Sequence, residues 1–234
     1  MTTTPPREQS AATTDPGQAP GVGRIALGLT ALLGPLLLAV ATGIVPYGTG
    51  DSDKDIVKDI AAHRTLTEVS VWGWILGGLA LVVGILVVGL LAMRHSPKLG
   101  LWGTLLFGTG LLAISFTPSM DVVALGGLDK GVSQDALVKV TDGTYALPVV
   151  GVPTLYFVAA HVVGAILLGT ALLRGRVIPA WAAWSLILAM PINVAGYAGS
   201  LMPVTVLSFL LLATGFGAAG LVVVRHGTGW TRTS

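Results

Sequence analysis

The sequence predicts an all-α protein, a polytopic bundle of six transmembrane helices with short amphipathic helices in its two long external segments. Hydrophobic residues make up 53% of the 234 residues and charged residues only 10%, which is typical of a bilayer-embedded bundle. Six apolar runs are long enough, at about 1.5 Å of rise per residue, to cross the roughly 30 Å hydrocarbon layer. Basic residues collect in the segments between alternate runs, as the positive-inside rule requires.

The N-terminal segment, residues 1–23, is predicted to be a disordered cytoplasmic tail. It holds four prolines and no aromatic residue, so it cannot bury enough apolar surface to offset the entropy of ordering. The next run, 25–45, is the first predicted span. Gly34 and Pro35 in its middle predict a kink rather than a break, because neighbouring helices satisfy the carbonyl that a proline leaves free.

An alternative for the first run is a cleaved signal peptide. Arg24 precedes the apolar residues, and Ala39 and Ala41 flank Val40 in the pattern of a cleavage site. The long leading tail and the apolar continuation beyond that site favour a retained span. In both interpretations residue 47 lies outside the cell.

The second span has the clearest signal in the chain. Residues 71–93 contain no charge and are followed at once by a basic cluster at 94–98, which favours the cytoplasmic side. Thr65 and Glu68 have the spacing of a capping box, so we expect this helix to begin near Leu66.

The two long external segments each contain a helical signal. In the first, Ile56, Val57 and Ile60 fall on one helical face, which predicts a short helix along the outer surface. In the second, Ser133 is placed to cap a short helix that ends near Thr141.

The remaining runs complete the topology, with a membrane domain over 24–226 and a cytoplasmic C-terminal tail over 227–234. The six spans are expected at about 25–45, 66–93, 99–117, 149–173, 177–200 and 203–224. Both termini are then cytoplasmic.

The distribution of charge excludes several classes of membrane protein. Every charged side chain lies outside the apolar runs of the predicted spans, with Glu68 in the first turn of the second, which argues against a carboxylate proton relay, a voltage sensor or an intramembrane enzyme with paired carboxylates. The chain has no cysteine and no HExxH, GxSxG or phosphate-loop motif. The sequence therefore predicts no catalytic residue and no cofactor, and a net charge of +2 gives no reason to expect nucleic acid.

One polar group is predicted inside the bundle. His161 and Asn193 lie at similar depth in the fourth and fifth spans, so we expect that they can hydrogen-bond across a helix pair. Tyr197 follows Asn193 by one turn, and Tyr156 matches its depth. Two interpretations stay open: a structural bond that joins two helices, or a site for a solute or a proton. A bis-histidine haem site is disfavoured because no second histidine lies in a span.

Asp51, Asp53 and Asp55 form an external candidate for a divalent cation, since carboxylate oxygens at alternate positions begin a calcium loop. The pattern then fails, because Ile56 stands where the turn glycine belongs and Ala62 where a bidentate glutamate belongs. The favoured interpretation is that these acids complement a helix N-terminus.

Pairs of small residues four positions apart allow close helix packing, either within the chain or between copies or other membrane proteins. These pairs are Gly73 and Gly77, Ala160 and Gly164, and Ala213 and Gly217.

The Pro/Thr-rich tail, six Ala/Leu/Val/Gly-rich spans, short basic inner turns such as Arg174-Gly175-Arg176, and acidic outer helices together resemble the six-helix integral membrane proteins of unknown function that are common in GC-rich actinobacterial genomes. The resemblance covers the whole chain and implies a plasma-membrane location. It supplies no catalytic residues.

Two hypotheses follow for the function. The first is a non-catalytic membrane component that binds partners or membrane lipids. The second is a permease for a small neutral solute, with its site around His161 and Asn193. A membrane enzyme ranks third, because no nucleophile with its base and no metal triad is visible.

Overall fold

The computed structural model describes residues 21–227, and every regular element in this range is a helix. The two predicted tails fall largely on 1–20 and 228–234, which lie outside the described residues. The elements are α1 (Val22–Ile44), α2 (Asp53–Ala62), α3 (Arg64–His95), α4 (Pro97–Ser115), α5 (Met120–Asp129), α6 (Gln134–Tyr145), α7 (Pro148–Arg174), α8 (Ala180–Ala198) and α9 (Met202–His226). The predicted all-α fold class is confirmed.

Six of these helices, α1, α3, α4, α7, α8 and α9, are long and apolar enough to cross a membrane. A helix satisfies its own backbone hydrogen bonds, which the hydrocarbon core cannot do for it. The chain is therefore a multi-pass membrane protein.

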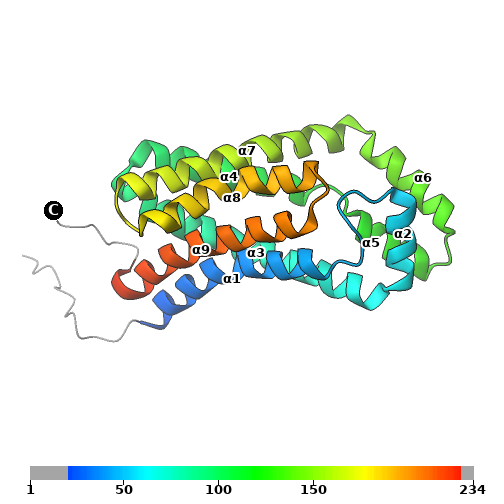
Figure 1. Cartoon of the computed structure of the whole chain (residues 1–234), viewed down its shortest axis with the longest axis horizontal. Coiled ribbons are helices and arrows are strands. Elements are labelled where there is room, and N and C mark those ends of the chain that lie inside the picture. Colours follow the sequence, from blue (N-terminus) through cyan, green and yellow to red (C-terminus); the bar gives the residue numbers. More distant parts are fainter. Residues whose placement is uncertain (1–20, 228–234) are drawn as a thin grey trace, which may run out of the picture.

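The six long helices form a closed ring of neighbours. Going round, α1 packs on α3, α3 on α4, α4 on α7, α7 on α8, α8 on α9, and α9 on α1, while α3 also touches α7 and α9. The three short helices α2, α5 and α6 contact one another beyond one end of the bundle (Figure 1). We call these three helices the outer cap. The described chain begins and ends at the opposite end, which we call the terminal end.

Close backbone contact holds α1 against α9. A Cβ atom on Gly28 would lie 2.7 Å from the carbonyl oxygen of Gly220, and one on Gly220 would lie 2.5 Å from that of Gly28. Only glycine at both positions permits this separation, because the backbone fixes where a Cβ atom lies and no rotamer change can move it away from the opposing carbonyl oxygen. Between α4 and α9 the rings of Phe107 and Phe216 meet edge to face at 6.1 Å, a favoured aromatic geometry.

The small-residue pairs pack within the chain. Gly73 and Gly77 both face α1, Gly164 faces the backbone of α4 at Phe107, and Gly217 faces Leu32 of α1. These positions let the helices approach closely without a bulky side chain between them.

Prolines inside the long helices do not end them. α1 continues through Pro35 and α8 through Pro191, as expected, and α7 also continues through Pro153. A membrane helix tolerates an internal proline where neighbouring helices or local adjustments satisfy the freed carbonyl.

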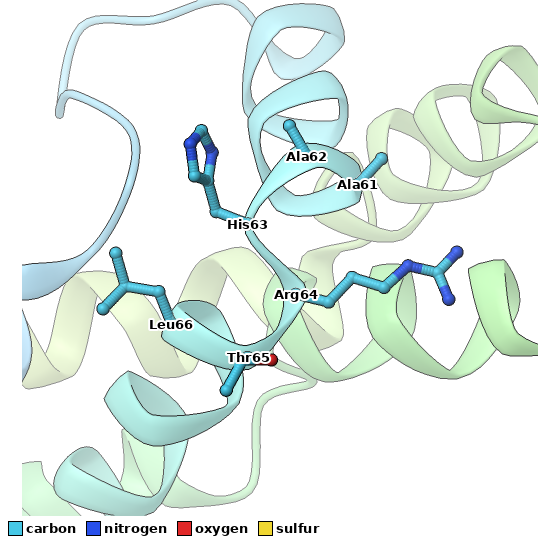
Figure 2. Close-up of a pocket in the computed structure, with 6 residues that line it drawn as sticks. All are labelled: Ala61, Ala62, His63, Arg64, Thr65 and Leu66. Atoms are coloured by element: carbon cyan, nitrogen blue, oxygen red, sulfur yellow. The ribbon is translucent and has the colours of Figure 1, made fainter.

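The capping box predicted before the second span is wrong. α3 begins at Arg64 rather than near Leu66, and its N-cap residue is His63, which makes no side-chain capping bond. The reason is that α2 ends at Ala62, so a single residue joins the two helices and Thr65 already lies in the first turn of α3. Figure 2 shows this junction, with the side chain of Arg64 directed toward a neighbouring helix and that of His63 on the other side.

The external helices agree only in part with those predicted from the sequence. α2 forms as predicted, with Val57 and Ile60 buried. The Ser133 hydroxyl accepts a bond from the Ala136 amide at 3.3 Å, as expected for an N-cap. α6 nevertheless continues past Thr141 to Tyr145, and α5 was not predicted at all.

Candidate functional site

His161 lies in the interior of the bundle on α7, with only 2% of its surface exposed. Its Nδ1 atom is 2.5 Å from the carbonyl oxygen of Phe157 one turn earlier, and the two rings stack at 4.2 Å. A carbonyl only accepts, so Nδ1 carries the proton in the neutral ring. The Nε2 atom is buried and has no hydrogen-bond partner.

Asn193 on α8 is also buried, and it faces α9 rather than α7. Its side-chain amide donates to the Ser208 hydroxyl at 2.9 Å, and Ser208 in turn donates to the carbonyl oxygen of Thr205 at 2.6 Å. This chain of bonds joins two neighbouring helices and satisfies their polar groups.

The structure does not join His161 to Asn193. The imidazole bends back onto its own helix, because helical side chains lean toward the preceding turn, and the asparagine bonds to the adjacent helix instead. The predicted polar group is thus divided among different helix contacts.

The two tyrosines of the predicted group have separate neighbours. Tyr156 shares a hydrogen bond of 2.6 Å with Thr109, which joins α7 to α4. Tyr197 lies near the outer end of α8, close to Tyr47 in the segment that follows α1. Both side chains are partly exposed, unlike His161 and Asn193.

The acidic residues proposed as a cation site also have different partners. Asp51 accepts a bond from the Gly48 amide, and Asp55 accepts one from the Ser52 hydroxyl. Asp53 hydrogen-bonds Asp142 of α6. Within residues 21–227 there is no group of three or more His, Cys, Asp or Glu side chains that could hold a metal ion.

A second polar group, which the sequence analysis missed, attaches the outer cap to the bundle. The Tyr47 hydroxyl, just after α1, donates to Asp121 of α5 at 2.5 Å. Burial, and next the negative charge of Asp121, raise the pKa of the Tyr47 phenol above its ordinary range, so the phenol stays protonated and acts as a donor. The partners are 74 residues apart in the chain, so no local pattern could have revealed the pair.

Further contacts hold the cap together. Tyr145 of α6 donates to the carbonyl oxygen of Pro118 at 3.2 Å, and Arg64 of α3 pairs with Asp129 of α5 at 3.0 Å. Both partners of that ion pair are well exposed, so it adds little stability.

A surface hollow of about 420 Å³ lies at the junction of α2 and α3, beside Arg64 (Figure 2). No residue of the predicted polar group lines it.

Asp53 of α2 and Asp142 of α6 form a pair of carboxyl groups within the outer cap. Their mutual hydrogen bond, then burial, then the charge of Asp142 raise the pKa of Asp53. The pair is most stable when one of the two carboxyl groups is protonated and donates its proton to the other.

Charge is divided sharply between the two ends of the described chain. Every described carboxylate lies at the outer-cap end. The basic residues at the terminal end are Arg24, Arg94, Lys98, Arg174, Arg176 and Arg225.

No protein-family model, curated protein or solved structure matches this chain. The fold and the closed polar interior define the class, which is a multi-pass helical membrane protein.

Proposed function

We propose that this chain is a non-catalytic component of the plasma membrane, with both ends in the cytoplasm, and that it binds a partner protein through its outer cap. The observation that carries the proposal is the closure of the polar interior. His161 and Asn193 are almost wholly buried, and Asn193 is bonded within the bundle. Its function then depends on its surfaces.

The division of charge supports the orientation. The terminal end carries arginines and a lysine without a described carboxylate, and basic residues in short turns favour the cytoplasmic side of a membrane. The outer cap, where acidic residues outnumber basic ones, then lies outside the cell.

The cap has the properties of a preformed binding surface. Long-range contacts from Tyr47 and Tyr145 fix its helices against the bundle, and a surface that is already ordered loses little entropy on binding. It also exposes Val122 and Val140 to the outside, each by more than half of its surface. Its acidic character favours a partner with a basic outer face.

The second candidate is a permease for a small neutral solute, and the buried Nε2 atom of His161 favours it. A buried acceptor without a partner costs about 1–3 kcal/mol, and a solute hydroxyl or amide would remove that cost. Proline within α1 and α8 also fits helices that move.

Cysteine labelling in intact cells separates the two candidates, because the natural chain contains no cysteine. We expect an impermeant thiol reagent to modify Lys130→Cys, on the exposed turn after α5, and to leave His161→Cys and Asn193→Cys unmodified. Each variant is compared at equal amounts of membrane-inserted protein. Labelling of both interior cysteines would support the permease and contradict the closed interior.

Cross-linking tests the cap as the binding surface. A short thiol-directed photo-cross-linker on Val140→Cys should give one discrete product in intact cells. The matched control, Leu101→Cys, is similarly exposed on α4 at the terminal end and should not give that product. Two differently tagged copies show whether the product is a dimer of the chain. A cap cysteine that accepts the reagent and gives no product would contradict the proposal.

A further inference from the structure

A groove of about 1090 Å³ lies at the terminal end of the bundle, away from the outer cap. Its walls come from α1, the end of α7, α8 and α9, and from the turn between α7 and α8. Leu32, Trp181 and Leu221 are among its apolar lining residues, and Arg176 and Arg225 lie among its polar ones. None of the residues that form the cap contributes to it.

The face of α9 explains the form of this groove. Thr214, Ala218, Leu221 and Arg225 follow one another at spacings of four, three and four, which places them on one helical face. That face runs for about 16 Å, at 1.5 Å per residue. Small side chains leave the deep part hollow, and the arginine stands at the terminal end.

The charged part of the groove is basic only. Arg176, Arg225 and His226 line it, and no Asp or Glu is among its lining residues. The guanidinium of Arg24 lies close to Gly227, just past the end of α9, and adds a further positive charge. An anion in the groove would meet the two lining arginines and no described carboxylate.

The backbone of Arg176 closes the C-terminal end of α7. Its φ angle is +49°, and the amides of Arg176 and Val177 donate to the carbonyl oxygens of Leu173 and Leu172 at 3.1 and 3.0 Å, the arrangement in which a left-handed residue ends a helix. These bonds fix the turn that places Arg176 at the groove.

We propose that this groove binds one anionic glycerophospholipid. The headgroup phosphate lies against Arg176 and Arg225, because guanidinium groups bind phosphate with paired hydrogen bonds. One acyl chain follows the apolar face of α9 toward Thr214. Basic pockets between membrane helices bind acidic headgroups in this way. The proposal does not depend on the partner suggested for the outer cap.

Native mass spectrometry of the full-length protein in a neutral detergent tests this site. The probes are phosphatidylglycerol and phosphatidylcholine with identical acyl chains. We expect the first phosphatidylglycerol to bind at least tenfold more tightly than phosphatidylcholine. The double variant Arg176→Gln/Arg225→Gln should lose about thirtyfold in affinity for phosphatidylglycerol, at about a factor of five for each cation, and bind the two lipids alike.

The matched control is Arg94→Gln/Arg174→Gln, which removes the same charge from the same end but from residues outside the groove. It should keep the preference for phosphatidylglycerol. Equal losses in the two double variants would mean diffuse attraction to basic residues and would overturn the proposal.

A second variant tests the apolar part without touching a charge. Thr214→Phe fills the groove, and it should weaken binding of both lipids while the melting temperature of the lipid-free protein stays unchanged. Equal binding of the two lipids by the natural protein would overturn the proposal. So would a dimer, visible in the same spectra, that Thr214→Phe dissociates, because a second copy would then occupy the groove.

Discussion

Replacing Gly220 by alanine tests whether α1 remains part of the mature bundle. The new Cβ atom would lie 2.5 Å from the carbonyl oxygen of Gly28, far closer than carbon and oxygen normally approach. The helix backbone fixes the positions of both the Cβ atom and the carbonyl oxygen, so no rotamer change can relieve the contact. α1 and α9 must then move apart, although each helix contains completely buried residues such as Ala31 and Ala219.

The expected loss follows from two opposing effects. Overpacking in a tight core costs about 1–3 kcal/mol, and exchanging glycine for alanine inside a helix returns about 0.5–1 kcal/mol. We therefore expect Gly220→Ala to lower the free energy of unfolding by about 1–2 kcal/mol. The control is Gly78→Ala in α3, where a Cβ atom would meet nothing within 4 Å, and it should be neutral or slightly stabilising.

Thermal unfolding of the purified protein in one detergent measures both variants. For a chain of this size a loss of 1–2 kcal/mol lowers the midpoint by about 2–8 °C. If a signal peptidase removed the first run near Ala41, Gly220→Ala would have no opposing helix and would behave like Gly78→Ala. Equal midpoints for the two variants would therefore refute the packing argument, and the mass of the intact protein would show whether cleavage is the reason.

Two further predictions concern the outer cap. Tyr47→Phe should lower the free energy of unfolding by about 1 kcal/mol, because it leaves the partly buried Asp121 carboxylate without its donor; a double-mutant cycle with Asp121→Asn would show no coupling if the bond were unimportant. The pKa of Asp53 is raised in the folded protein by its hydrogen bond to Asp142, so this pair's contribution to stability is present below the ordinary pKa of an aspartate and is lost as the pH rises through the raised value. Asp53→Asn should therefore stabilise the protein more at pH 7 than at pH 4 in thermal unfolding, and an equal effect at both would contradict the pairing.

The positions of the long helices could be predicted because the bilayer imposes a simple requirement on the chain. A span needs about 20 apolar residues, and residues 71–93 satisfy this without any knowledge of what surrounds them. Residues close together in sequence determine the lengths of the spans, the side of the membrane on which the basic residues collect, and the N-cap at Ser133. The structure contains six helices that are long and apolar enough to cross a membrane, and it agrees with that cap.

The partners of the polar side chains could not be predicted in this way. His161 and Asn193 have similar depth, but depth does not specify the direction in which each side chain points around its helix. In the fold the first returns to Phe157 and the second bonds to Ser208. The capping box failed for a related reason, since α2 ends immediately before α3 and moves the start of that helix to Arg64.

The sequence by itself determined that this is an all-α membrane protein, where its apolar helices lie, and that its charges stay at or beyond the ends of these helices, because burial in lipid selects for composition over a run of residues. Only the tertiary structure decided which helices are neighbours, how Tyr47 reaches Asp121 to hold the outer cap, and that Arg176 and Arg225 both line one largely apolar groove. Those contacts join residues far apart in the chain, and they depend on the relative rotation of packed helices, which composition and local spacing do not encode.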